Sequence, residues 1–230
     1  DNLWGRAIEC GVLEDPWNEP PHDVWVMTKD PEETPDTPTY VDVDFEKGVP
    51  VALDGEKMPL AALVEKLNQV AGDNGYGRLD LMENRMVGLK SRECYEVPAA
   101  LTLITAHKAL EDLTLERDVL HQKLYLEQTW ATCVYNGQWF SPLKKALDAF
   151  MAETQKFVTG TVRLKFFKGH CTVMGRKSPC SLYDYGLATY DRDTTFDEKA
   201  AVGFIEIETL SLKTWAKMQG PTSLAAQSLS

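Results

Sequence analysis

The residues best suited to chemistry lie in one short segment, 77–96, where acids, three arginines, a lysine and a tyrosine alternate with apolar residues. Polar groups at this density beside buried backbone cost free energy unless a ligand or a partner satisfies them. We therefore predict a binding site for a small zwitterion in this segment. In this interpretation the Glu83 carboxylate receives an ammonium group, and the Tyr95 hydroxyl completes a polar pocket for an amino acid.

The same segment also supports an interpretation without a ligand. Glu83 would then pair with Arg85 or Arg92 in a surface network, an arrangement that contributes little to stability. The triplet Lys90-Ser91-Arg92 presents a similar choice, because an arginine fork suits a phosphate or a carboxylate. Such a triplet is more often a solvated strand end. The residue pattern leaves both alternatives open.

The composition narrows the classes of function. The 24 basic and 35 acidic residues give a formal net charge of −11, which disfavours nucleic-acid binding. No apolar run approaches the ~20 residues that span a bilayer, and no signal-peptide pattern occurs, so we expect a cytoplasmic protein without membrane contact. The five cysteines form no C-x-x-C pair and the four histidines lack ligand spacing, so we expect reduced thiols and no metal site. No glycine-rich phosphate loop is present, and we expect no cofactor-binding residues in this segment.

The elements that must position these residues alternate between hairpins and helices. Two-residue periodicity predicts hairpins at 40–53, at the central segment with its turn around Asn84-Arg85, and at 161–174. Residues 23–28 form a further candidate strand. Helical periodicity and end signals predict helices at 60–70, 98–113, 114–135 (capped by Thr114), 142–155 and 197–218. Because these elements come in blocks without a βαβ repeat, we predict an α+β fold with mixed or antiparallel hairpins packed against helices.

The last predicted helix suggests a division of the chain. It is amphipathic and follows a polar loop, so we predict a domain at 1–196 and a protruding helical arm with its tail at 197–230. The apolar face of the arm packs either on a partner subunit or on the protein's own core, and the sequence leaves both open.

Four stretches of the sequence are similar to one enzyme family. They are 2–16, 77–96, 178–183 (Ser-Pro-Cys-Ser-Leu-Tyr) and 203–207 (Gly-Phe-Ile-Glu-Ile). The chain resembles, over essentially its whole length, the C-terminal synthetase and multimerisation portion of argininosuccinate synthase. This resemblance implies ATP-dependent ligation of citrulline and aspartate to argininosuccinate in arginine biosynthesis, with release of AMP and pyrophosphate.

The resemblance also implies site residues and partners. The family's citrulline-binding glutamate and tyrosine fall on Glu83 and Tyr95, and no catalytic residue is assigned. ATP with Mg²⁺ is the implied co-substrate, bound mainly by an N-terminal module whose S-G-G-x-D-T-S loop does not occur in this sequence. A homotetramer held by the C-terminal helix is implied, and this segment alone is not expected to be active.

Four positions depart from the family pattern near these residues. Ala7 stands where a citrulline-contacting serine is expected, Val97 replaces a threonine, and Glu93 and Ala100 replace glycines. Losing one substrate hydrogen bond typically costs ~0.5–1.5 kcal/mol, which weakens binding without abolishing it. The departures support a second hypothesis: a truncated, non-catalytic paralogue that serves as an oligomerisation or binding module.

Overall fold

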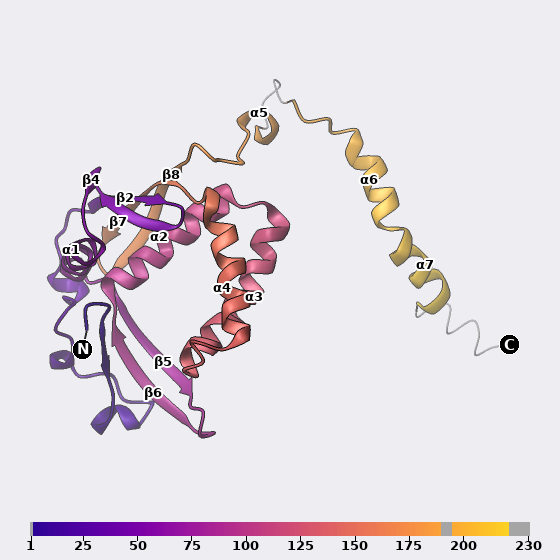
Figure 1. Cartoon of the computed structure of the whole chain (residues 1–230). Coiled ribbons are helices and arrows are strands. Elements are labelled where there is room, and N and C mark those ends of the chain that lie inside the picture. Colours follow the sequence, from indigo (N-terminus) through magenta and orange to yellow (C-terminus); the bar gives the residue numbers. More distant parts are fainter. Residues whose placement is uncertain (1, 190–194, 221–230) are drawn as a thin grey trace. The chain divides into compact units, whose positions relative to one another are not determined.

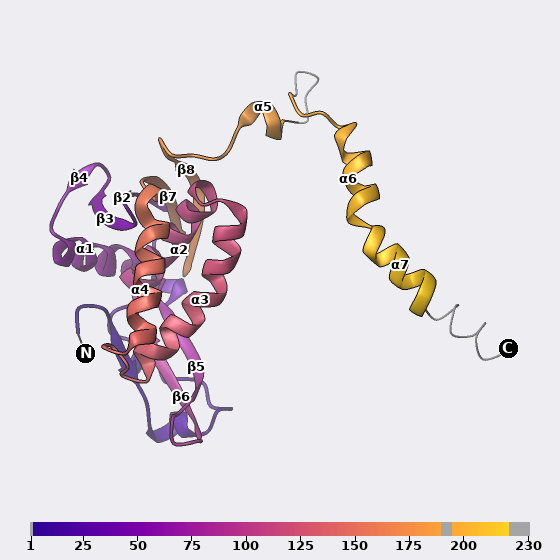
Figure 2. The same ribbon diagram turned by 45° about the vertical axis from the view of Figure 1, so that its right-hand side comes forward.

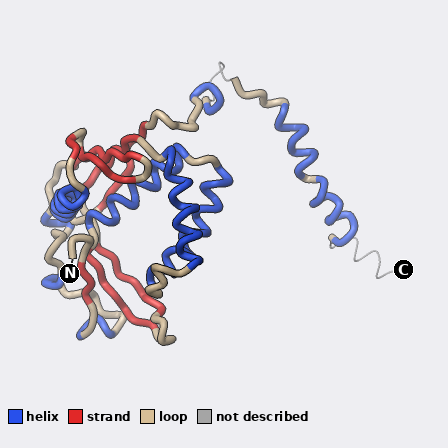
Figure 3. Tube along the Cα trace, in the orientation of Figure 1, coloured by secondary structure: helices blue, strands red, loops and turns tan. Residues whose placement is uncertain are grey.

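The structure is a computed structural model that describes residues 2–189 and 195–220 (Figure 1). The chain forms two compact units, residues 1–182 and 183–230. The first unit contains two separate antiparallel sheets, visible as two groups of strands in Figure 3, together with the helices that pack on them. The predicted α+β class is therefore confirmed. The predicted division between residues 196 and 197 stays a prediction.

The larger sheet has five strands in the order β4-β3-β2-β7-β8. Their bounds are β2 Thr39–Glu46, β3 Val49–Leu53, β4 Glu56–Lys57, β7 Gly160–Phe167 and β8 His170–Lys177. The hairpins predicted at 40–53 and 161–174 are β2–β3 and β7–β8, and they join where β2 pairs with β7. Alternate residues of β2 and β7, such as Val43 and Leu164, are fully buried, because successive side chains point to opposite faces.

The smaller sheet has three strands in the order β1-β6-β5, with β1 Arg6–Ile8, β5 Arg78–Asn84 and β6 Lys90–Glu96. The predicted central hairpin is β5–β6. Its turn occupies residues 85–89, where the backbone N–H of Arg85 donates to the carbonyl of Leu89 at 2.8 Å. Strand β1 adds to β6 from a segment in which no strand was predicted, since three residues give too short a pattern to detect.

Four long helices complete the first unit: α1 Leu60–Asp73, α2 Pro98–Thr114, α3 Arg117–Tyr135 and α4 Pro142–Thr154. Helices α1 and α2 share one core with the five-stranded sheet, to which Leu67 and Leu110 contribute fully buried side chains. Helix α2 follows β6 directly, so the small sheet is joined to this core. Helices α3 and α4 pair with each other, and Figures 1 and 2 show the end of α3 beside β5.

Two local predictions were wrong, each because a side chain satisfies backbone groups in a way the pattern does not reveal. Thr114 does not cap the following helix: it ends α2 and donates to the carbonyl of Leu110. Glu116 caps α3 instead, accepting from the backbone of Asp118 and Val119. Residues 23–28 form no strand, because a buried carboxylate from β6 accepts the N–H groups that a neighbouring strand would otherwise bind.

The second unit contains, among its described residues, α5 Tyr185–Ala188, α6 Ala200–Glu208 and α7 Leu210–Gln219. The single helix predicted at 197–218 is thus two helices that meet at Thr209. No residue of α6 or α7 is buried in the described part of this unit, although both carry large apolar side chains such as Ile205 and Trp215. Across residues 2–189 and 195–220, no helix combines the length and apolar character required to cross a bilayer.

Candidate functional site

Strand alternation sorts the crowded polar residues of the β5–β6 hairpin onto two faces of the small sheet. Residues that lie opposite each other in an antiparallel pair share a face. The register pairs Ala7 with Tyr95, Glu83 with Ser91, and Leu81 with Glu93. We call the face that carries Ala7, Glu83, Ser91, Glu93 and Tyr95 the site face. The opposite face carries Arg6, Arg78, Asp80, Arg92 and Glu96, and we call it the clamp face.

The clamp face holds paired charges that stabilise the fold. Arg92 forms a bidentate pair with Asp80, with its Nη2 2.6 Å from Oδ2, and also donates to the carbonyls of Asp15 and Asn18. The Arg92 guanidinium holds the pKa of Asp80 below its usual value. Lys90 donates to the Asn84 side chain at 2.7 Å. Arg92 thus uses its guanidinium on the protein itself, whereas Lys90 is exposed at the start of β6, as expected of a solvated strand end.

Glu96 is the centre of the clamp face, with a side chain that is 0% exposed. One oxygen accepts from the backbone of Met27 and Thr28 and from the Thr28 hydroxyl, and the other accepts from Val26 N–H and from Arg6 Nη1 at 2.8 Å. Burial raises the pKa of Glu96, but these hydrogen bonds outweigh burial and hold it below its usual value. The carboxylate thus fixes loop 24–28 to the small sheet.

The two residues predicted to bind a substrate meet on the site face. The Tyr95 hydroxyl donates a hydrogen bond to Oε1 of Glu83, which lies on the neighbouring strand. Burial, followed by the hydrogen bond to Glu83, raises the pKa of Tyr95, so the phenol stays protonated as a donor. The alternative pairing of Glu83 with Arg85 or Arg92 is not what the structure shows, because Arg85 pairs with Glu93 at 3.1 Å and Arg92 with Asp80.

A third residue, which sequence reasoning missed, forms a hydrogen bond with the Glu83 carboxylate. Tyr135, the last residue of α3, donates from its hydroxyl to Glu83 Oε2 at 3.0 Å. Both oxygens of the Glu83 carboxylate thus accept a phenolic hydrogen bond. No sequence signal pointed to Tyr135, because it lies 52 residues from Glu83 and belongs to a different element.

The four departures from the family pattern occupy defined places. Ala7 lies opposite Tyr95 on β1 and is exposed, so its methyl group faces the space beside the tyrosine. Glu93 is buried on the site face, where burial and then the neighbouring Glu9 raise its pKa. Val97 is the N-cap of α2, a position at which a threonine hydroxyl commonly accepts from the backbone. Ala100 is buried in the first turn of that helix.

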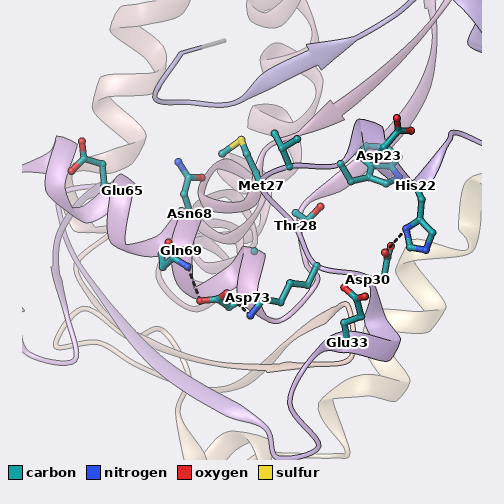
Figure 4. Close-up of a pocket in the computed structure, with 14 residues that line it drawn as sticks. His22, Asp23, Met27, Thr28, Asp30, Glu33, Glu65, Asn68, Gln69 and Asp73 are labelled. Carbon is teal, nitrogen blue, oxygen red and sulfur yellow. Dashed lines mark hydrogen bonds and ion pairs between the residues drawn. The ribbon is translucent and has the colours of Figure 1, made fainter.

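One pocket is lined in part by the small sheet, and another is lined by a loop and helix α1. A pocket of about 650 Å³ opens beside Tyr135 and is lined by the hairpin and by one side of α3: Asn84, Met86, Gln128, Ala131, Thr132, Tyr135 and Asn136. A pocket of about 870 Å³ lies between loop 22–33 and α1 (Figure 4). Some of its charged groups pair with one another, as Lys29 does with Asp73 at 2.8 Å and His22 with Asp30 at 2.5 Å. The first pocket adjoins the predicted residues, and the second does not contain them.

The fold and the site define an α+β module whose small sheet carries a carboxylate that accepts hydrogen bonds from two tyrosine hydroxyls. Residues 1–215 match the family model described as the arginosuccinate synthase C-terminal domain. The chain is 55% identical to an argininosuccinate synthase of Rubrobacter xylanophilus over 226 residues, which are 98% of this chain and 55% of that relative. It is 57% identical to that of Bacillus licheniformis over 225 residues, 98% of this chain and 56% of the relative.

The chain therefore belongs to the argininosuccinate synthase family. It spans about half the length of the curated relatives that it matches. Members of this family carry the name of a ligase of arginine biosynthesis.

Proposed function

We propose that this chain forms the citrulline-binding part of an argininosuccinate synthase. In the proposed reaction the ureido oxygen of citrulline attacks the α-phosphate of ATP, pyrophosphate leaves, and the amine of aspartate then displaces AMP. In this reaction the chain's own part is to bind citrulline. The Glu83 carboxylate receives the ammonium group of citrulline, and the Tyr95 hydroxyl holds the Glu83 carboxylate by a hydrogen bond. The observation that supports this most is the meeting of Glu83 and Tyr95 on one face of the small sheet.

The hydrogen-bonded carboxylate suits an ammonium group for a physical reason. A carboxylate offers about four acceptor positions, and an ammonium group needs up to three acceptors. Tyr95 and Tyr135 each occupy one position on Glu83, so further positions stay open to a cation. Hydrogen bonds between charged partners are about twice as strong as neutral ones, so this contact is well suited to anchor an amino acid.

ATP and Mg²⁺ do not fit the charged groups of this hairpin. In the described part of the hairpin, Arg78, Arg85 and Arg92 each contact a carboxylate, and Lys90 contacts Asn84. A triphosphate requires cations or backbone N–H groups that are free to bind it. We therefore assign ATP and Mg²⁺ to a part of the protein outside these residues.

The substrate assignment is tested by titrating citrulline into the intact protein and into its Glu83→Gln variant. The variant keeps the shape of the side chain and removes its charge, so citrulline affinity should fall about tenfold to a hundredfold, as for a charged hydrogen bond. Glu46→Gln is a matched control, because Glu46 is exposed and, among the described residues, pairs with a surface lysine, Lys57. An affinity for citrulline that is unchanged in Glu83→Gln excludes the assigned site.

A second candidate function is a non-catalytic binding or oligomerisation module. The exposed methyl group of Ala7 beside Tyr95 favours it, because the family pattern places a substrate-binding hydroxyl there. The intact protein distinguishes the two candidates when it is supplied with ATP, citrulline and aspartate. Citrulline-dependent release of pyrophosphate supports the ligase, whereas citrulline binding without pyrophosphate release supports the module.

We also propose that α6 and α7 hold a homo-oligomer together, a tetramer by family resemblance. The apolar side chains of these helices are not buried within the described part of their own unit. Large exposed apolar surfaces commonly mark contacts between proteins. A second copy of the chain is the partner that the resemblance supplies.

A further inference from the structure

Tyr135 and Tyr95 approach the Glu83 carboxylate from two different parts of the fold. Tyr95 belongs to β6, the strand next to Glu83, whereas Tyr135 ends helix α3. Their hydroxyls contact different oxygens of the carboxylate, Oε1 for Tyr95 and Oε2 for Tyr135. A carboxylate held by one hydrogen bond still turns about its last single bond, and a second bond on the other oxygen stops that rotation.

The end of α3 is held firmly enough to serve this purpose. The indole N–H of Trp130 donates to Asp148 Oδ1 at 2.8 Å, which ties the last two turns of α3 to α4. Lys144, itself buried, donates to the same oxygen at 2.6 Å, and its ammonium group lies 4.6 Å from the centre of the Trp130 ring. Beyond Tyr135 the backbone N–H of Asn136 closes the helix on the carbonyl of Thr132.

We propose that Tyr135 is a positioning residue for substrate binding: its hydroxyl fixes the plane of the Glu83 carboxylate, so that the free acceptor positions face the ammonium group of the bound amino acid. This inference rests on the proposed function and assigns to α3 a part in it. Glu83 raises the pKa of Tyr135, so the phenol keeps its proton and remains a donor at neutral pH.

The position of Tyr135 fits this role in a second way. Its side chain is 53% exposed and lines the 650 Å³ pocket together with Asn84 of the hairpin. A purely structural tyrosine is commonly buried along most of its ring, because its stabilising effect comes mainly from the apolar surface it removes from water. Tyr135 keeps half of its surface open, so its defining contact is the polar one to Glu83.

The test compares Tyr135→Phe with Tyr125→Phe in the intact protein. Tyr125 lies on the same helix and is 75% exposed, so its variant removes a phenolic hydroxyl from α3 away from Glu83. We expect the Kd and KM for citrulline to rise about three- to tenfold in Tyr135→Phe. The KM values for ATP and aspartate should stay within about twofold of wild type, and Tyr125→Phe should leave all three unchanged.

A double-mutant cycle shows whether Tyr135 acts through Glu83. If it does, Tyr135→Phe has little further effect once Glu83→Gln is present, because the carboxylate to be positioned is gone. Additive effects of the two variants contradict the proposed positioning. If Tyr135→Phe lowers the thermal stability and weakens the binding of citrulline, ATP and aspartate equally, Tyr135 has a structural role alone. That result also overturns the inference.

The outcomes for the inference and for the proposed function are separable. If the wild-type protein does not bind citrulline, the proposed function fails, and this inference fails with it. If wild type binds citrulline and Glu83→Gln weakens it, the function stands. Unchanged binding in Tyr135→Phe then overturns the inference alone. Tighter binding in that variant also overturns it, because the hydroxyl would be competing with the substrate for Glu83.

Discussion

Replacing the buried Glu96 by glutamine should destabilise the protein strongly, although the two side chains have nearly the same shape. The glutamine oxygen is best placed where Oε1 now accepts from Met27, Thr28 N–H and the Thr28 hydroxyl. The glutamine NH₂ group then faces Arg6 and the N–H of Val26, which donate to Oε2 in the wild type. Arg6 and the N–H of Val26 thus lose their acceptor, and the glutamine NH₂ group, itself a donor, faces them.

The magnitude follows from these contacts. An unsatisfied buried donor costs about 1–3 kcal/mol, and removing one partner of a buried ion pair costs about 3–5 kcal/mol in total. We expect Glu96→Gln to lower the free energy of unfolding by about 3–5 kcal/mol. At ~2–4 °C per kcal/mol for a chain of this size, the apparent Tm should fall by about 10 °C.

The assay is thermal unfolding of the intact protein across a range of pH. The folded-state pKa of Glu96 lies below its reference value of 4.5, so its stabilising effect is complete above pH 4.5 and is lost as the pH falls through the folded-state pKa. The difference between wild type and Glu96→Gln should therefore be largest near neutral pH and shrink in acid. The exposed Glu46→Gln variant should stay within about 0.5 kcal/mol of wild type. A Tm for Glu96→Gln within 2 °C of wild type corresponds to a change of at most ~1 kcal/mol. That result contradicts the claim that the hydrogen bonds of Glu96 stabilise the fold strongly.

Two further predictions concern the arm and the site face. Deleting residues 197–230 should yield a smaller oligomer by light scattering, because α6 and α7 supply the proposed contacts between copies. Retention of the full oligomer contradicts the proposal. Glu93→Gln should raise the free energy of unfolding at pH 7 by less than about 1 kcal/mol, because burial and Glu9 raise the pKa of Glu93 and so disfavour its charged form in the folded state. This gain in stability should disappear at a pH below the unfolded-state pKa of Glu93. Thermal unfolding at pH 7 is the measurement, and a wild type more stable than Glu93→Gln contradicts the prediction.

The local elements were largely predictable, and the errors have a common cause. The hairpins at 40–53 and 161–174 follow from alternation, which depends only on neighbouring residues. The cap of α3 and the path of residues 23–28 depend on which side chain reaches which backbone group. Glu96 accepts from Met27 across 69 residues of sequence, and no local pattern encodes such a contact.

The candidate site shows the same division. The residue pattern singled out Glu83 and Tyr95 but left open whether Glu83 meets a ligand or an arginine, and the family resemblance supplied citrulline. The fold brings Glu83 to Tyr95 and leaves the arginines to Asp80 and Glu93. The alternation that decided this was readable in the sequence, whereas the strand register that pairs specific residues was not.

By itself the sequence determined the α+β class, the hairpin and helix blocks, the concentration of charge at 77–96 and the family resemblance, because these depend on composition and short-range periodicity. Only the tertiary structure decided that this charge divides into a site face and a clamp face, and that Tyr135 from a distant helix completes the contacts of Glu83. The physical reason is that hydrogen bonds and ion pairs form between groups that are close in space, and packing of sheet and helix, which the local sequence does not specify, sets those distances.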